Sequence, residues 1–127
     1  MTTWITICDT CKREGWEETG TEVTDGEALA ALVEAALAQS AGAAKVKTRR
    51  ISCLMGCKQA CNVALQAHGK LAYTLGAFAP TQEAAEGIVA YALAHAQSAT
   101  GQVPYRQWPA AVKGHFITRH PPLDADR

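Results

Sequence analysis

Two hydrophobic patterns alternate along the first half of the chain and predict a mixed α/β fold. Apolar and polar residues alternate over residues 4–8, which is typical of a short β-strand. From residue 29 to 37 the apolar positions recur at helical spacing instead, and Thr24-x-x-Glu27 precedes them as a capping-box pattern. We therefore expect a strand, a helix that begins near Thr24 and ends by Gly42, and a second strand over residues 45–52.

The second half of the chain predicts a hairpin, another helix and a tail. Apolar residues alternate on both sides of His68-Gly69, which indicates a β-hairpin. Pro80-Thr81 precedes a second apolar stripe at helical spacing, and this helix should end before Gly101. The residues after it include prolines from Pro104 to Pro122, so we expect an extended arm there rather than a packed element.

The predicted order of elements is β-α-β-β-β-α. A β-α-β unit requires a right-handed crossover between parallel strands, the hairpin adds antiparallel strands, and the two helices cover the sheet. At 127 residues and 13.5 kDa the chain can bury a single core. The sequence thus predicts one α/β domain over residues 1–100, with residues 101–127 as an extended C-terminal arm of the same domain.

The five cysteines fall into two groups, each of which follows a predicted strand. The groups are Cys8-Asp-Thr-Cys11 and Cys53-Leu-Met-Gly-Cys57-Lys-Gln-Ala-Cys61. Four convergent thiolates can hold an iron–sulfur cluster or a structural zinc ion, and a CxxC after a strand is also typical of a dithiol redox pair. The spacing leaves all three interpretations open. Zinc is less needed where a core already exists, and the dithiol interpretation assigns no role to the second group.

Residues around the cysteines carry a resemblance to known families. The order of elements, residues 53–63 and the Gly69-Lys70 to Tyr73 segment resemble the thioredoxin-like [2Fe–2S] ferredoxins, although these space the first two cysteines more widely and commonly have proline in place of Cys61. More closely, nearly the whole chain is similar to a family of uncharacterised bacterial proteins described as predicted metal-binding and often encoded near cobalamin-synthesis or metal-handling genes. The motifs that carry this similarity are Cys8-Asp-x-Cys11, Cys53-Leu-x-Gly-Cys57-x-x-Ala-Cys61-x-Val-Ala-Leu65, Gly69-Lys70, Tyr73, Gly76 and the tail from Val103-Pro-Tyr-Arg-x-x-Pro109 through Arg119-x-Pro-Pro122.

The resemblance implies a thioredoxin-like, cluster-binding domain. We expect Cys8, Cys11, Cys53 and Cys57 to bind a [2Fe–2S] cluster, with Cys61 as the alternative ligand. The expected function is that of a ferredoxin-like one-electron carrier, and the resemblance extends this to cobalamin or metal metabolism. One alternative is a zinc- or cobalt-binding protein for metal delivery, and the other is a CxxC thiol–disulfide oxidoreductase. The chain offers no plausible acid–base set, so an electron-transfer or metal-binding protein is expected rather than an enzyme.

The charge pattern bears on partners and location. Formal net charge is zero, but residues 14–44 contain acids without Lys or Arg, and residues 45–58 contain bases without acids. The basic run is short and lacks interleaved aromatic residues, so nucleic-acid binding is not expected. If Arg49, Arg50 and Lys58 lie near the cluster, they raise its potential.

No apolar run approaches the roughly 20 residues of a membrane span, and no signal peptide is recognised. We expect a cytoplasmic location, where thiols stay reduced. The expected partners are a redox protein that docks near the cysteine loops and a second copy of the chain in a homodimer.

Overall fold

The computed structural model describes residues 2–13, 15–16, 23–40, 43–55 and 57–122. The strands are Thr3–Cys8 (β1), Val46–Ile51 (β2), Val63–Gln66 (β3), Ala72–Leu75 (β4) and Phe116–His120 (β5), and the helices are Asp25–Ala38 (α1) and Gln82–Gln97 (α2). The connections between them include 3-10 turns at Ala43–Lys45, Cys57–Gln59, Tyr105–Gln107 and Ala110–Val112.

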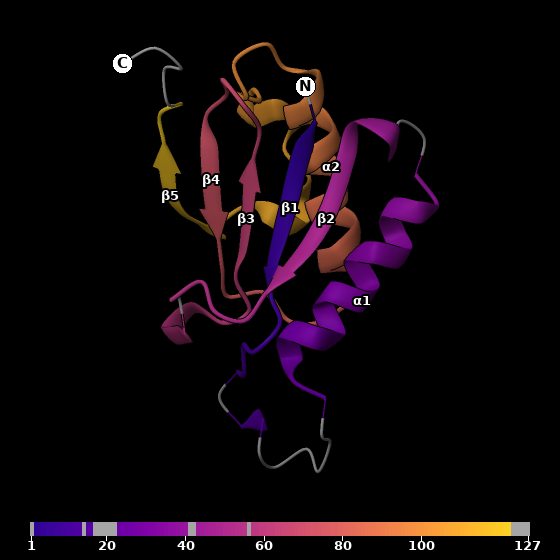
Figure 1. Cartoon of the computed structure of the whole chain (residues 1–127), viewed down its shortest axis with the longest axis vertical. Coiled ribbons are helices and arrows are strands. Elements are labelled where there is room, and N and C mark those ends of the chain that lie inside the picture. Colours follow the sequence, from indigo (N-terminus) through magenta and orange to yellow (C-terminus); the bar gives the residue numbers. More distant parts are fainter. Residues whose placement is uncertain (1, 14, 17–22, 41–42, 56, 123–127) are drawn as a thin grey trace.

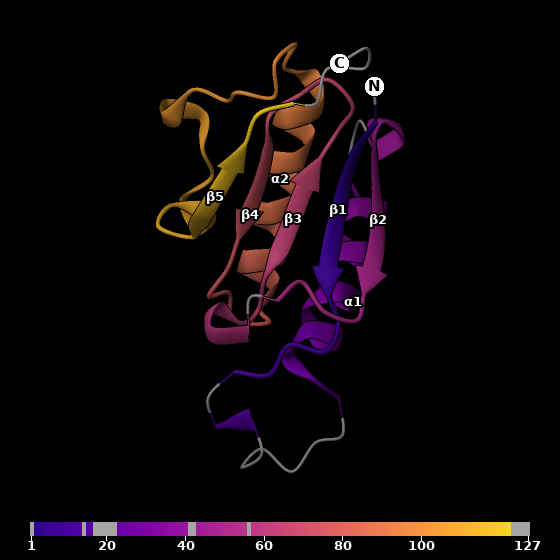
Figure 2. The ribbon, with the colours of Figure 1, turned by 60° about the vertical axis from the view of Figure 1, so that its left-hand side comes forward.

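The strands form one mixed sheet in the order β2-β1-β3-β4-β5. β1 and β2 are parallel, whereas β1–β3, β3–β4 and β4–β5 are antiparallel. The helices lie together on one face of the sheet and pack against each other (Figures 1 and 2). The predicted α/β fold, with a parallel β-α-β unit followed by a hairpin, is confirmed.

Both helices begin at the threonines that the sequence indicates. The Thr24 side chain accepts a hydrogen bond from the backbone N–H of Glu27 at 3.0 Å, and the Thr81 side chain accepts one from Ala84 at 3.1 Å. These bonds satisfy N–H groups that have no partner within the helix. α1 ends at Ala38, and the expected stop at Gly42 lies outside the described residues.

The core lies between the sheet and the two helices. Fully buried residues come from β1 and β3, from both helices and from the segment after β4, and they include Ile5, Ile7, Leu65, Leu29, Val33, Ile88 and Phe78. Burying one such side chain stabilises the fold by about 1.5–3 kcal/mol. This layer supplies a rigid base for the loops at the ends of the strands.

The C-terminal segment differs from the predicted extended arm. Residues 116–120 form β5 along β4, with Leu75 opposite Phe116 and Tyr73 opposite Arg119. Val103 and Val112 are buried, and the Trp108 ring lies 4.5 Å from the Phe116 ring, centroid to centroid. Prolines at Pro104 and Pro109 precede single 3-10 turns rather than an unpacked chain. The segment is therefore an integral part of the sheet and core.

A buried polar network joins the start of β1 to the end of α2. His95 Nε2 donates to the Leu71 carbonyl at 2.7 Å, so its Nδ1 accepts from the Thr3 hydroxyl at 2.8 Å. The Lys70 ammonium donates to the carbonyls of His95 and Ala96 at 3.1 and 2.7 Å. These are terminal helix carbonyls, which a cation satisfies well.

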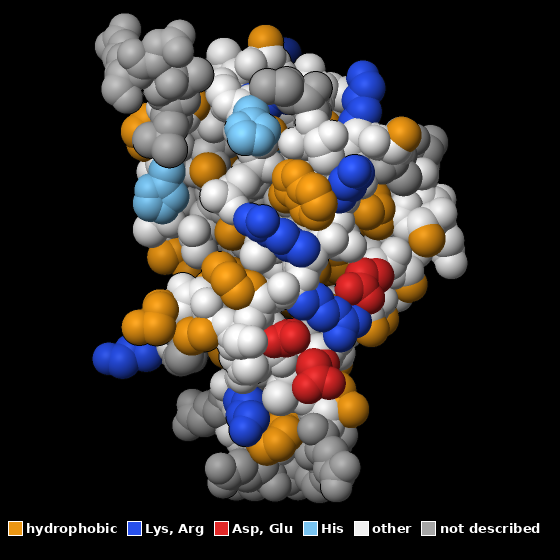
Figure 3. All heavy atoms as spheres, in the orientation of Figure 1, with side chains coloured by type: hydrophobic (Ala, Val, Ile, Leu, Met, Phe, Trp, Pro, Cys, Tyr) orange, Lys and Arg blue, Asp and Glu red, His pale blue; other side chains and the backbone are white. Residues whose placement is uncertain are grey.

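Charged residues cross the uncovered face of the sheet. In the orientation of Figure 3, basic side chains lie over the middle of this face, near β1 and β2. Lys47 and Arg49 lie over the Trp4 ring, at 5.7 and 5.6 Å from its centroid. Arg50 forms a bidentate ion pair with Glu34, in which Nε and Nη2 lie 2.9 and 2.8 Å from the carboxylate oxygens. The basic residues 45–58 and the acidic residues 14–44 therefore partly neutralise each other.

None of the helices in the described part of the chain has the length and apolar character needed to cross a membrane.

Candidate cysteine site

The sheet brings the two cysteine groups to one edge. β1 and β2 run in parallel and end together, with Cys8 opposite Ile51. β3 runs the other way beside β1, so it begins where β1 ends, and the Cys8 N–H donates to the Asn62 carbonyl at 3.2 Å. Both cysteine loops consequently lie at the same end of the sheet (Figures 1 and 2).

Hydrogen bonds tie the first loop to the second. The Asp9 N–H donates to the Ile51 carbonyl at 3.0 Å, and the Thr10 hydroxyl donates to the Ser52 carbonyl. The backbone N–H of Leu54, which directly follows Cys53, donates to the Cys8 sulfur. The two groups are therefore neighbours in space, although the N-terminal helix and β2 separate them in sequence.

Residues at the start of α1 form hydrogen bonds with the first cysteine loop, residues 8–11. Gly26 N–H donates to the Cys11 carbonyl at 2.9 Å, and the Thr24 hydroxyl donates to the Asp9 carbonyl. A Cβ atom at Gly26 would lie 2.0 Å from the Cys8 carbonyl oxygen, a distance that no side chain tolerates. Only glycine allows the helix to approach the cysteine loop this closely.

Among the cysteine side chains that the structure describes, those of Cys8, Cys11 and Cys61 are buried. Cys8 and Cys11 are each 2% exposed and Cys61 is 0% exposed; the Cys11 thiol donates to the Cys8 sulfur. Cys53 is exposed, and its sulfur accepts from the Met55 N–H at 3.2 Å. Cys57 begins the 3-10 turn after this loop, but its side chain lies outside the described residues.

Burial and hydrogen bonding separate the pKa values of these thiols. Burial raises the pKa of Cys11 to about 12, and its hydrogen bond to Cys8 acts in the same direction. Burial also raises the pKa of Cys61 to about 12. Burial opposes ionisation of Cys8 as well, but hydrogen bonds to its sulfur from Cys11, Thr10 and Leu54 outweigh it and lower its pKa. Negative charge at this site is therefore most stable on the Cys8 sulfur.

The cation that acts on the cysteines is not one that the sequence singled out. Arg49 donates to the Thr6 hydroxyl at 2.7 Å, and Arg50 is held by Glu34, so both are engaged elsewhere. Arg13, two residues after Cys11, instead lowers the pKa of Cys61, against the larger effects of burial and of the Asp25 carboxylate, which both raise it. The spacing of Arg13 from Cys11 was visible in the sequence, but nothing there placed it beside Cys61.

Cysteine sulfurs are the kind of ligand that a thiolate-bound metal centre needs. Cys8 and Cys11 are hydrogen-bonded, and Cys61 is buried close enough to Cys8 to interact with it electrostatically. The residue after Cys53 donates its backbone N–H to the Cys8 sulfur, as backbone N–H groups do around iron–sulfur clusters. Among the described side chains, which exclude that of Cys57, no three Cys, His, Asp or Glu residues are arranged to hold a metal ion as they stand. Binding a metal would therefore require several of these side chains to move, that of the exposed Cys53 among them.

Comparison with known proteins gives a family but no activity. Residues 5–122 match a family model described as a protein of unknown function (DUF1636). No curated protein and no solved structure matches the chain.

Proposed function

We propose, for this chain that belongs to the DUF1636 family, the function of a ferredoxin-like one-electron carrier with a [2Fe–2S] cluster. Because the function of the family is unknown, the proposal is argued from the geometry of the cysteine loops. The observation that carries the proposal is the contact between the two cysteine loops, in which the Leu54 N–H donates to the Cys8 sulfur. Cys8 and Cys11 from the first loop, with Cys53 and Cys57 from the second, are the proposed ligands. A four-thiolate set of this kind is what such a cluster requires.

Cys61 is the alternative fourth ligand. Its side chain is fully buried next to Cys8 and Cys11, and it feels the charge of Cys8. In this arrangement the first loop supplies two thiolates, Cys53 supplies the third and Cys61, two residues before β3, supplies the fourth. Replacing Cys57 and Cys61 separately by serine identifies which of them is needed.

The residues around the sulfurs would stabilise the added negative charge of a reduced centre. When bound, a [2Fe–2S] cluster accepts and releases one electron. Hydrogen bonds from the backbone N–H groups of Leu54 and Thr10 to the Cys8 sulfur disperse negative charge. They favour reduction and raise the potential. At Cys61 the positive charge of Arg13 acts in the same direction, but the Asp25 carboxylate opposes it with a larger effect.

Exposed apolar side chains beside Cys53 support a protein partner at this edge. Met55 is 89% exposed and Ile51 is 42% exposed, and both flank the loop that carries Cys53. Electron transfer between proteins needs close approach to the redox centre, and such encounters use small surfaces. We propose that a redox partner docks here. A cytoplasmic location agrees with the proposal, because reduced thiols persist there.

A dithiol oxidoreductase is the second candidate, and the hydrogen bond between Cys8 and Cys11 favours it. In that reaction the Cys8 thiolate attacks a substrate disulfide and releases one thiol. Cys11 then attacks the Cys8 sulfur, which releases the second thiol and leaves a Cys8–Cys11 disulfide. However, both sulfurs are almost fully buried, whereas thiol exchange requires access to the attacking sulfur. The geometry therefore favours the metal centre.

Reduction of the protein purified without oxygen tests the proposed function. We expect a red-brown protein whose visible absorbance falls on addition of dithionite. The reduced protein should give an electron paramagnetic resonance signal. Cys8→Ser should lose both, and Ser52→Ala, a change at an exposed neighbour of Cys53, should keep both. A colourless protein that contains zinc or cobalt would support the metal-delivery alternative instead. Disulfide reduction that Cys11→Ser abolishes without release of metal would support the oxidoreductase.

A further inference from the structure

Strand β2 forms one edge of the sheet. Among the described strands it pairs with β1 alone, with Val46 opposite Thr3 and Ile51 opposite Cys8, and it is the outermost strand in Figure 2. An edge strand presents a row of backbone N–H and C=O groups on the side that has no neighbouring strand. Cys53 follows Ile51 by two residues, so this edge leads directly into the second cysteine loop.

The β2 side chains on the uncovered face of the sheet are basic. Lys47 and Arg49 are alternate residues of the strand, so they share one face. Lys47 lies opposite Trp4, and the residue after Trp4, Ile5, is fully buried in the core beneath the helices. Lys47 and Arg49 therefore lie on the face that the helices leave uncovered, where basic side chains are visible in Figure 3. Both are exposed.

These two cations have no acidic partner in the described part of the chain. None of the five strands contains Asp or Glu, and the ion pair found among the described residues uses neither cation. Neutral groups hold both side chains in place. The Lys47 ammonium lies 5.7 Å from the centroid of the Trp4 ring, and Arg49 donates to the Thr6 hydroxyl at 2.7 Å. Their charges remain available to an external carboxylate.

The charge of β2 selects among the possible occupants of this edge. A second copy of the chain would place β2 or the other edge strand, β5, against it, and β5 contains Arg119 but no acid. Like charges on facing strands are destabilising. A single-stranded nucleic acid needs exposed aromatic faces on which its bases stack, but Lys47 and Arg49 both lie over the Trp4 ring. An acidic strand meets neither obstacle.

We infer that the free edge of β2 binds an acidic, extended peptide segment of a partner protein as an additional strand of the sheet. Backbone hydrogen bonds along the edge supply affinity, and alternate side chains supply specificity. Carboxylates at alternate positions of the segment share one face and pair with Lys47 and Arg49. The inference uses no thiol and is therefore independent of the metal centre proposed above.

Titration of the isotope-labelled, full-length chain with synthetic peptides, followed by NMR of the backbone amides, tests the inference. The probe is acetyl-Ser-Val-Glu-Val-Glu-Val-Ser-amide, whose glutamates lie on one face of a strand. The isomer acetyl-Ser-Val-Glu-Glu-Val-Val-Ser-amide has the same charge but places them on opposite faces. A third peptide has the probe sequence with N-methyl groups on the central valine and the preceding glutamate, which removes donors from both of its edges.

We expect the probe to shift the amide signals of residues 46–51 and to slow hydrogen exchange of the β2 amides on the free edge. The isomer should bind about twofold to fivefold more weakly because one ion pair is lost. The N-methylated peptide should bind at least about fivefold more weakly because it loses backbone hydrogen bonds.

Variants of the chain test the charge pairing. Lys47→Gln should weaken the probe about twofold to fivefold, because it removes one exposed ion pair. Lys47→Glu should weaken the probe further, because it replaces an attraction by a repulsion. Lys113→Gln changes an exposed lysine outside β2 and is the matched control, which should bind the probe as the unchanged chain does. Thermal unfolding of each variant verifies that it is folded.

Four results would overturn the inference. The first is the absence of probe binding at millimolar concentration. The second is equal binding of the probe and either control peptide, which would show that charge alone attracts it. The third is a set of shifted amides outside β2, for example in β5. The fourth is tighter binding of an oligothymidylate than of the probe, which would make this face a nucleic-acid surface.

Discussion

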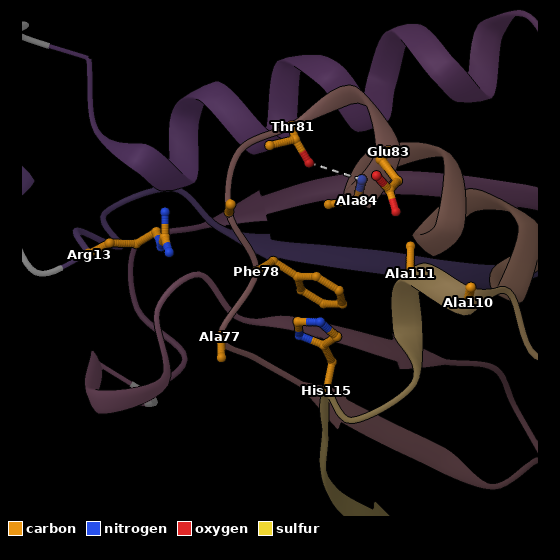
Figure 4. Close-up of a pocket in the computed structure, with 10 residues that line it drawn as sticks. Arg13, Ala77, Phe78, Thr81, Glu83, Ala84, Ala110, Ala111 and His115 are labelled. Atoms are coloured by element: carbon orange, nitrogen blue, oxygen red, sulfur yellow. Dashed lines mark hydrogen bonds between the residues drawn. The ribbon is translucent and has the colours of Figure 1, made fainter.

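Cys61 and Phe78 exchange two backbone hydrogen bonds, from Cys61 N to Phe78 O at 3.1 Å and from Phe78 N to Cys61 O at 3.3 Å. Phe78 lines a hollow that the first turn of α2 and the turn Ala110–Val112 also border (Figure 4), and Cys61 lies fully buried beside Cys8 and Cys11. This pair fixes the segment after β4 against the loop that carries Cys61.

The metal-free, reduced chain should react with iodoacetamide in an order set by exposure. We expect Cys53 to be alkylated first because it is exposed. Cys61 should react last because it is 0% exposed and its pKa is raised to about 12. Mass spectrometry of peptides at successive times measures the order. Equal rates at Cys53 and Cys61 would contradict the burial of Cys61. Protection of Cys53 in the metal-loaded chain would support its role as a ligand.

Gly26→Ala should weaken both the fold and metal retention. The new methyl group would overlap the Cys8 carbonyl oxygen, so α1 or the cysteine loop must shift. We expect a loss of about 1–3 kcal/mol in the free energy of unfolding, and less bound metal after dialysis. Ala31→Gly, at an exposed position of the same helix, is the control. It should cost about 1 kcal/mol through helix propensity without loss of metal.

Acid should destabilise the fold through His95. Burial lowers the pKa of His95 from 6.5, and its hydrogen bond to Leu71 opposes this only in part. Below pH 6.5 the unfolded chain therefore binds a proton at His95 that the folded chain does not bind. The free energy of unfolding decreases as the pH is lowered from 6.5 to the lower pKa of His95 in the folded state. The slope should approach about 1.4 kcal/mol per pH unit. Urea unfolding between pH 7.5 and 5.5 measures it.

Two variants identify the residue responsible for that slope. His68→Gln, at an exposed turn, should retain the pH dependence, and His95→Gln should lose it whatever its absolute stability. An unchanged slope in His95→Gln would show that another group titrates.

Lys70→Met should destabilise the C-terminal end of α2. The Lys70 ammonium donates to two terminal carbonyls, those of His95 and Ala96, and methionine fills similar space without a donor. We expect a loss of about 1–3 kcal/mol in the free energy of unfolding. Lys45→Met, at an exposed position, is the matched control and should change stability by less than about 0.5 kcal/mol. Equal effects of the two substitutions would contradict the capping role.

Local signals predicted most of the fold. Thr24 and Thr81 marked both helix starts because a cap is a matter of a few neighbouring residues. β5 was missed because four of its five residues are exposed, so the strand shows no buried alternation, and its pairing with β4 is a long-range contact. The same limit applies to the sites. The cysteine loops were visible in the sequence, but the meeting of Cys61 with Cys8 depends on the antiparallel register of β1 and β3.

The hollow lined by Phe78 and His115 could not be predicted either, because it also depends on long-range contacts. Arg13 and His115 come from opposite ends of the chain, and only the packing of the C-terminal segment against α2 brings them to one hollow. Some of these contacts require a glycine, because a Cβ atom would block the approach of the two segments. A Cβ atom at Gly87 would lie 2.6 Å from the Ala111 methyl group, so this glycine allows the turn Ala110–Val112 to sit against α2.

Counting iron and acid-labile sulfide in the protein purified without oxygen tests the central proposal most directly. A [2Fe–2S] cluster held by one chain predicts two irons and two sulfides per chain, and Cys8→Ser and Cys53→Ser should each lose both elements. One zinc ion per chain without sulfide, or full iron and sulfide content in Cys8→Ser, would contradict the proposal.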